Sequence, residues 1–186
     1  MNLTDATISV EKVLLWYKVT EEATMQYQRQ IKMLVRDSLP LPEAIVSAVN
    51  VGGEIEDLLA FQRNELEILA VFDYLSALEA LFCKDYQIRV NQKLKDPLSR
   101  HFRDIAKTRK DNDTRLGFEK DILSGWKEHA PQFKDIVSKL ISVFKYRHWV
   151  AHGRYWLPKL GSNKYDFFGI VYLFETFTNE FPFECE

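Results

Sequence analysis

The sequence predicts an all-α protein, a helical bundle of about six or seven helices with an N-terminal helical extension. Three observations lead to this prediction. Apolar residues recur at helical spacing along most of the chain. No stretch of useful length alternates apolar and polar residues as a half-buried strand does. Apolar residues make up 46% of the 186 positions, and glycine and proline together only 13, which indicates a folded globular chain.

The first two helices are expected within residues 8–50. Apolar side chains recur at helical spacing between residues 8 and 37. The two prolines of "SLPLPE" then interrupt the helix, because proline cannot occupy a helix interior. A short helix is expected up to Asn50, followed by a turn at "VGGE". We therefore assign residues 1–50 to the N-terminal extension and residues 51–186 to the main helical domain.

The helix expected from about residue 54 to residue 83 is the most apolar in the chain. In "ILAVFDYLSALEALF" the polar side chains besides the Tyr74 hydroxyl are Asp73, Ser76 and Glu79. They recur every three residues, so they form one narrow polar stripe on an otherwise apolar helix. This pattern predicts a central core helix whose stripe faces either water or a polar group inside the protein.

The second half of the chain is expected to hold the remaining helices. Asp96 is a candidate N-cap with Pro97 at the first helical position. A charged loop is expected at 108–114, then a helix from Arg115 to about His129. Pro131 opens the next helix, and aromatic residues from Phe167 to Phe181 mark the last one.

Composition and charge restrict the function classes. The net charge is −2, with −7 in residues 1–82 and +5 in residues 83–186, which permits a local anion-binding face. The longest apolar run, residues 68–82, is too short and too interrupted for a membrane span. Cys83 and Cys185 form no disulfide or metal framework. Without a visible secretory signal at the N-terminus, we expect a cytoplasmic protein with no membrane association.

The segment "FKYRHWVAHGRYW", residues 144–156, crowds basic and aromatic residues at the end of an amphipathic helix. Arg147 lies seven residues after Leu140 and eleven after Ile136, so it falls on the apolar face of that helix. Arginine stays charged, so at such a position it needs a carboxylate or a phosphate. Glu79 and Asp73 on the polar stripe are the internal candidates, with Glu79 preferred. A bound phosphate is the external one.

Two interpretations of the histidines remain open on these grounds. His152 beside Arg147 could act as a general acid or base on a phosphodiester while the arginine neutralises charge. Alternatively, His152 is an ordinary structural residue, which a histidine near an apolar helix end usually is, and the aromatics belong to the core. His148 and His152 are spaced i,i+4 and could share a metal ion, but no third ligand is placed nearby, so no metal and no cofactor are predicted. Flanking aromatic and basic side chains could stack on or contact RNA, namely Trp149, Arg154, Tyr155 and Trp156.

The segment "RHWVAH" resembles the signature of the HEPN family (higher eukaryotes and prokaryotes nucleotide-binding). That signature is an arginine, a polar residue, a few further residues and a histidine. The resemblance covers residues 54–181 and implies a HEPN-like bundle in which Arg147 and His152 are the catalytic pair. It further implies that His148 supports the pair, and Glu79 matches more loosely an acidic residue of an earlier helix.

The resemblance implies a metal-independent endoribonuclease that cleaves RNA by 2′-OH attack, in a toxin–antitoxin or phage-defence setting. It also implies a homodimer with both motifs lining one cleft, and a cognate antitoxin or regulatory protein as a possible partner. Toxins silenced by a partner nucleotidyltransferase carry tyrosine two residues after the histidine, where this chain has Arg154. The alternatives are a non-catalytic HEPN-like module that binds RNA, a nucleotide or a protein, and an unrelated helical interaction protein.

A second basic segment lies between Lys95 and Arg115. It holds seven Lys and Arg against four Asp. A solvated surface would give this pattern, and so would an RNA groove. If it is a groove, the expected contacts are Arg100, Arg103 and Lys107.

Overall fold

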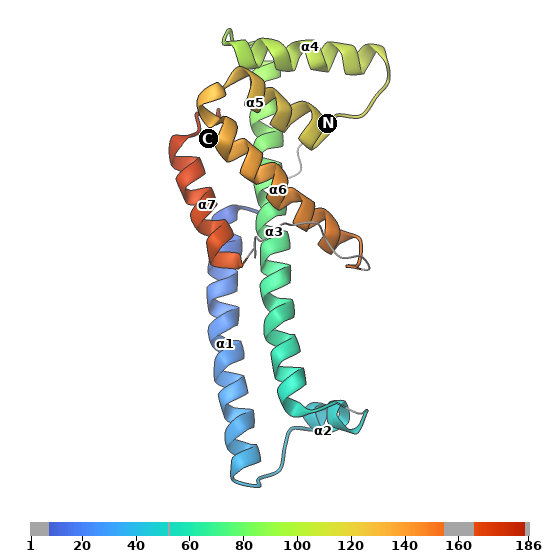
Figure 1. Cartoon of the computed structure of the whole chain (residues 1–186), viewed down its shortest axis with the longest axis vertical. Coiled ribbons are helices and arrows are strands. Elements are labelled where there is room, and N and C mark those ends of the chain that lie inside the picture. The colour runs from blue at the N-terminus through green and yellow to red at the C-terminus, as the bar shows by residue number, and fades with distance from the viewer. Residues whose placement is uncertain (1–7, 52, 155–165, 185–186) are drawn as a thin grey trace.

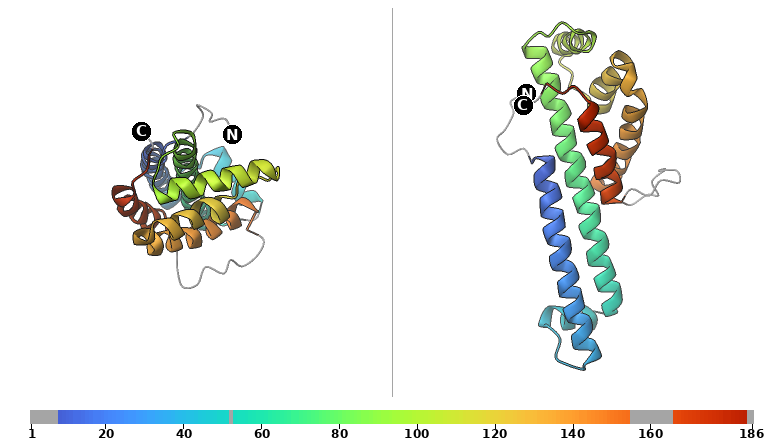
Figure 2. Two further views of the ribbon diagram at one scale, coloured as in Figure 1. Left: turned by 90° about the horizontal axis from the view of Figure 1, so that it is seen from above. Right: turned by 90° about the vertical axis from the view of Figure 1, so that its left-hand side faces the viewer.

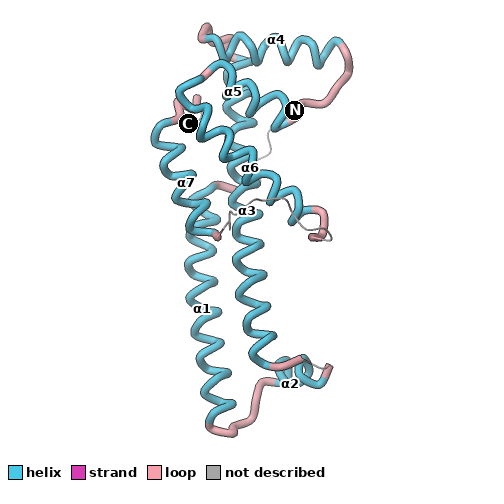
Figure 3. The backbone as a smooth tube through the Cα atoms, in the orientation of Figure 1, coloured by secondary structure: helices cyan, strands magenta, loops and turns pink. Residues whose placement is uncertain are grey.

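The computed structural model describes residues 8–51, 53–154 and 166–184, and these ranges contain helices and loops but no strand (Figure 3). The prediction of an all-α bundle of six or seven helices is confirmed. The seven α-helices of the described residues are α1 (Val10–Arg36), α2 (Glu43–Asn50), α3 (Ile55–Asn91), α4 (Pro97–Asp111), α5 (Ser124–His129), α6 (Lys134–Ala151) and α7 (Phe167–Glu180) (Figure 1).

Helices α1 and α3 form a long antiparallel hairpin, with α2 at its far end (Figure 1). The α1 helix begins after Ser9, whose hydroxyl accepts a hydrogen bond from the backbone N–H of Lys12 at 3.3 Å. Near the tip of the hairpin, Ile31, Ile45 and Leu59 form a small hydrophobic core of their own. This small core packs α1, α2 and α3 against one another at the tip of the hairpin.

Helix α3 is the central helix of the fold. It is about 55 Å long at 1.5 Å per residue. It continues to Asn91, eight residues beyond the end expected from sequence. In the sequence these extra turns look polar, because they contain Asp85 and Arg89. These two side chains are buried, at 0% and 3% exposed, and form an ion pair at 2.8 Å. Pairing allows charged residues inside a helix that is otherwise apolar at its core positions.

The main core lies around the C-terminal half of α3, where α4 crosses its end and α6 and α7 pack along its sides (Figure 2). Helix α5 packs against α4 and α6. Aromatic rings fill much of it. Phe82 of α3 contacts Trp126 of α5, and Phe181, just past α7, contacts both Trp126 and Phe133. Ring pairs in these tilted and edge-to-face arrangements add to the stabilisation from burial.

The structure corrects two expectations on the segment between α4 and α5. Helix α4 runs to Asp111, so the loop lies at 112–117 and not at 108–114. The next helix begins at Phe118, not Arg115, as a π-helical turn, Phe118–Leu123, that leads into α5. The buried carboxylate of Asp121 explains this local geometry. It accepts hydrogen bonds at 2.7 Å from the Arg109 guanidinium and from the backbone N–H of Gly117.

The other expected helix boundaries agree with the structure. Asp96 caps α4 by accepting from the backbone N–H of Ser99 at 2.9 Å, with Pro97 at the first helical position. Pro131 begins a 3-10 turn, Pro131–Phe133, that leads into α6. None of the helices in the described ranges combines the length and apolar character of a membrane span.

The assigned boundary at residue 50 falls in the connection between α2 and α3. The extension is not packed separately along its whole length, however. Val13 and Tyr17 of α1 belong to the same hydrophobic core as α6 and α7, and the Tyr17 ring lies 4.1 Å from that of Phe167. The start of α1 therefore contributes to the main core.

Candidate functional site

The C-terminal turns of α6 pack on one face of α3. On that face, side chains recur every three or four residues, at Glu65, Leu69, Phe72, Ser76 and Glu79. Its members contact both arginines at the end of α6. The residues of this face therefore position the "RHWVAH" segment.

Arg147 points from α6 toward α3, as its place on the apolar face predicted. Its Nη1 atom lies 3.1 Å from Oε2 of Glu79, and its Nε donates a long hydrogen bond of 3.4 Å to the Ser76 hydroxyl. The guanidinium carbon lies 5.3 Å from the centre of the Phe72 ring, within cation–π range. The prediction that Glu79 pairs with Arg147 is confirmed.

The Arg147–Glu79 contact is partly open to solvent. The two side chains are 30% and 29% exposed. Although the charged atoms are close, Oε2 of Glu79 accepts no hydrogen bond of good geometry, so the contact is an ion pair without a well-directed hydrogen bond. Nη2 of Arg147 makes no hydrogen bond within the described part of the chain. The arginine is therefore held at one edge while its other edge can accept an anion.

Asp73 lies on the same side of α3 but is not paired with Arg147. It has no hydrogen-bond or ion-pair partner among the described residues, and burial raises the pKa of its carboxyl group. Cys83, one turn after Glu79, has a thiol whose pKa burial and the Glu79 carboxylate raise to about 11. Such a thiol stays protonated at neutral pH and is a poor nucleophile.

The chain leaves α6 through a left-handed turn. The backbone N–H of His152 bonds to the carbonyl of His148 at 3.1 Å, and that of Arg154 to the carbonyl of Trp149 at 3.2 Å. Gly153 follows with a φ of +80°, the conformation that favours glycine at the end of a helix. This turn fixes the position of His152 at the last turn of the helix.

Arg154 also has positive φ, at +57°, and its guanidinium makes a bidentate ion pair with Glu65 at 2.7 and 2.8 Å. The pair fixes the chain after the motif to α3 and lowers the pKa of the Glu65 carboxyl group. Arg154 was expected to contact RNA, and the structure shows it bound to a carboxylate of its own chain. Extending the polar stripe of α3 back by two turns would have pointed to Glu65.

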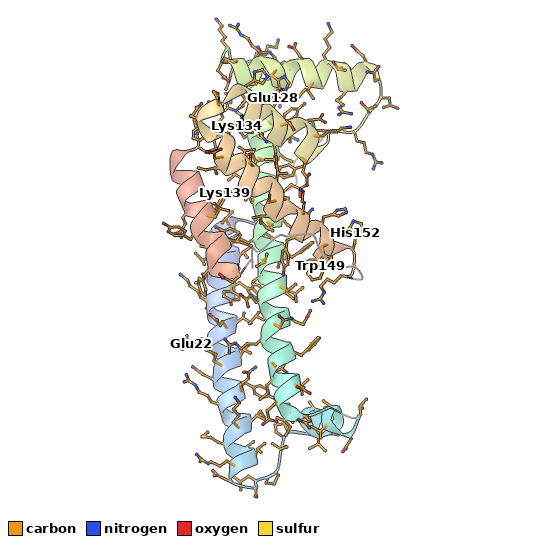
Figure 4. The ribbon with its side chains drawn as sticks, viewed as in Figure 1. Glu22, Glu128, Lys134, Lys139, Trp149 and His152 are labelled. Carbon is orange, nitrogen blue, oxygen red and sulfur yellow. The ribbon has the colours of Figure 1, made fainter. Side chains whose placement is uncertain are left out.

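The two motif histidines are adjacent and exposed. The ring centres of His148 and His152 lie 4.2 Å apart, with their planes tilted by 54°. Figure 4 shows His152 at the end of α6, directed away from α3, with Trp149 close by. Trp149 is half-buried, and its ring centre lies 5.5 Å from that of Tyr146. Tyr155 and Trp156 lie outside the described residues.

The second basic segment lies at the other end of the domain. Helix α4 crosses the end of α3, well away from His152 (Figure 4). Arg100 and Lys107 are exposed on it, whereas Arg103 is half-buried and donates to the carbonyl oxygen of Leu94. Arg103 thus stabilises the loop that connects α3 and α4. The structure does not bring these three residues to the motif.

A pocket of about 680 Å³ opens between α3, α4 and the loop after α4. Three basic side chains and one acidic one border it, together with polar residues of α3. They include Gln87, Asn91, Arg109, Lys110, Asp113 and Arg115. No residue of the "RHWVAH" segment lines this pocket, so the described residues offer two separate places where an anion could bind.

Comparison of the chain with known proteins finds no matching family model, no matching curated protein and no matching solved structure. The HEPN resemblance therefore rests on the six residues from Arg147 to His152 and on the helical setting in which they lie.

Proposed function

We propose that this protein is a metal-independent endoribonuclease of the HEPN type, with Arg147 and His152 as the catalytic pair. The observation that supports this most is the placement of Arg147. Its guanidinium is held by Glu79 and Ser76, and its side chain is 30% exposed. It lies within the last two turns of α6 beside the exposed His148 and His152. A purely structural role for Arg147 would not account for the two exposed histidines beside it.

The residues suggest the following chemistry. His152 removes the proton from the 2′-OH of an RNA nucleotide, and that oxygen forms a bond to the adjacent phosphorus. The bond from phosphorus to the 5′-oxygen breaks, and the 5′-oxygen takes up a proton. His148, whose ring centre lies 4.2 Å from that of His152, offers a second imidazole for this proton. The free edge of Arg147 stabilises the charge that develops on the phosphoryl oxygens.

A homodimer would complete the site in this proposal. Phe61 and Leu69 are 61% and 52% exposed and lie one turn before and after Glu65, on the face of α3 that meets the motif. Exposed apolar side chains beside a polar site are typical of a surface that another protein covers. A second copy of this chain placed there would bring the two motifs together about a two-fold axis. An antitoxin-like protein is the alternative occupant.

The decisive experiment is cleavage of total RNA by the purified protein in excess EDTA. We expect products with 2′,3′-cyclic phosphate ends, no cleavage of DNA, and no cleavage by His152→Ala or Arg147→Ala. Lys145→Ala is the matched control, since Lys145 is an exposed residue of the same helix outside the motif, and it should cleave normally. Intact RNA with the unmodified protein, or products with 5′-phosphate and 3′-OH ends, would contradict the proposal.

One observation favours the alternative function, a module that binds a nucleotide without cleaving RNA. The pocket beside α4 is large enough for a nucleotide and has a basic border away from the motif. Thermal shift measurements with nucleoside mono-, di- and triphosphates test this alternative. Stabilisation that disappears in Lys110→Ala/Arg115→Ala and persists in Arg147→Ala would favour it. Stabilisation lost only in Arg147→Ala would instead support the motif as the anion site.

A further inference from the structure

The chain has four histidines, and they lie in two pairs. One pair is His148 and His152 of the motif. The other is His101 of α4 and His129 at the end of α5, whose ring centres are also 4.2 Å apart. Only the second pair brings together residues that are distant in sequence. The carboxylate of Glu128 lies close to both of its histidines.

We propose that His101, Glu128 and His129 bind a divalent transition metal ion, with Zn²⁺ the best match, and that the ion fastens α4 to α5. One ligand atom from each of the three residues lies within 4.8 Å of the other two. A tetrahedral zinc ion holds nitrogen and oxygen ligands about 2.0–2.2 Å from itself, which places them about 3.4 Å from one another. Because Glu128 and His129 are exposed, small side-chain rotations are enough to close this difference.

The close contact between the two helices positions His101. Gly125 is buried in α5, and a Cβ atom at that position would lie 2.6 Å from the Phe102 ring and 3.1 Å from the His101 ring. Glycine therefore allows the α5 backbone to approach α4 directly at His101. The two ligands from α5 follow one turn later, on the side that faces this histidine.

The chemistry of the three ligands selects the metal. Two imidazoles and one carboxylate suit zinc and its neighbours, whereas Mg²⁺ and Ca²⁺ prefer all-oxygen sites. A metal ion binds the neutral form of imidazole. Burial, and after it the charge of the nearby His129, lower the pKa of His101. Glu128, Asp104 and Asp121 place negative charge around it.

The proposed ion is separate from the ribonuclease proposal. Glu128 lies beside α4, and His152 lies at the far end of α6 (Figure 4). The ion would act as a clamp. Among the described residues, α4 contacts α3, α5 and the π-helical turn before α5 but has no extensive contact with α6 or α7, so a bond from His101 to α5 would strengthen one of its few contacts. Metal binding and RNA cleavage can therefore be tested independently.

The test is calorimetric titration of ZnCl₂ into tag-free protein that has been treated with chelator and dialysed into a non-chelating buffer. We expect one Zn²⁺ per chain, a higher Tm with Zn²⁺ than without, and no rise with Mg²⁺. Glu128→Gln keeps the size of an exposed side chain and should weaken zinc affinity by about tenfold or more. His101→Gln and His129→Gln should do the same, and Tm without metal shows whether each variant is folded.

The double variant His148→Gln/His152→Gln is the matched control, because it removes the other histidine pair, which has the same ring separation. It should bind Zn²⁺ with unchanged affinity and stoichiometry. Absence of zinc binding by the unmodified protein would overturn the proposal, as would binding that Glu128→Gln leaves unchanged. Loss of binding in the motif double variant, or equal stabilisation by Mg²⁺, would also overturn it.

Discussion

Nη1 of Arg147 lies 3.1 Å from Oε2 of Glu79, so the arginine of the motif is held by a carboxylate from the central helix. We expect Glu79→Ala to lower the free energy of unfolding by about 1–3 kcal/mol, between the values for exposed and fully buried ion pairs, because both side chains are about 30% exposed. RNA cleavage should fall as well, since Arg147 loses its support.

Urea denaturation and the RNA assay measure the two effects of Glu79→Ala. Asp73→Ala is the matched control: it removes a carboxylate from the same side of α3 that has no ion-pair partner among the described residues. It should leave cleavage unchanged. Equal losses of cleavage in both variants would show that Glu79 has no special role in positioning Arg147.

The Arg154–Glu65 pair should make stability depend on pH. Hydrogen bonding to Arg154 lowers the pKa of the Glu65 carboxyl group below its ordinary value of 4.5. A lowered pKa stabilises the folded state above the unfolded value, and this stabilisation is lost as the pH falls through the folded value. Glu65→Gln should therefore be less stable than the unmodified protein at pH 7, with a difference that shrinks below about pH 4.5. A difference that stays constant from pH 7 to pH 3 would exclude this linkage.

The buried pair of Asp85 and Arg89 should be the most sensitive polar contact in the fold. Arg89 also donates to Ser99 and to the carbonyl of Pro182, and Asp85 accepts from the backbone N–H of Glu184, so the pair joins α3, α4 and the segment after α7. Asp85→Ala leaves a buried guanidinium without its nearest carboxylate and should cost about 3–5 kcal/mol of unfolding free energy.

A double-mutant cycle separates the pair from the burial of each partner. Asp85→Leu combined with Arg89→Met removes both charges, and we expect its destabilisation to be smaller than the sum of the two single variants. Strict additivity, measured by urea denaturation, would indicate that the two charges do not interact.

The exposed basic residues of α4 should affect RNA binding only if this helix contacts RNA. Arg100→Ala/Lys107→Ala should then weaken binding and reduce the slope of log Kobs against log salt by about 0.7 for each lost phosphate contact. Arg103→Ala should mainly lower stability, because its guanidinium holds the carbonyl of Leu94. An unchanged salt slope in the double variant would assign α4 to the solvated surface.

The oligomeric state depends on the apolar side chains beside Glu65. If a second copy covers Phe61 and Leu69, Phe61→Asp/Leu69→Asp should shift the protein from dimer to monomer in light scattering at micromolar concentration. Leu15→Asp/Val19→Asp on α1 is the matched control, since these side chains are 65% and 61% exposed, and it should leave the dimer intact. A monomeric unmodified protein would contradict the shared cleft.

The sequence by itself determined the helical class and much of the element order. Apolar periodicity located α1, α3, α6 and α7, because a helix must bury its apolar face at a period of 3.6 residues. Local chemistry located the start of α4, where Asp96 caps the backbone and Pro97 needs no hydrogen bond. The same periodicity directed Arg147 inward, and a charge facing a core requires a carboxylate, which led to Glu79.

Tertiary structure decided the features that depend on pairs of distant residues. Asp85 and Arg89 look like surface residues in the sequence, and only their ion pair and burial under the chain after α7 explain the longer α3. Arg154 looks like an RNA contact until Glu65, 89 residues earlier, is brought against it. His101 and His129 meet because Gly125 lets two helices touch. Periodicity reports which face of a helix is buried, but a charge is matched to its partner only when packing places two faces together.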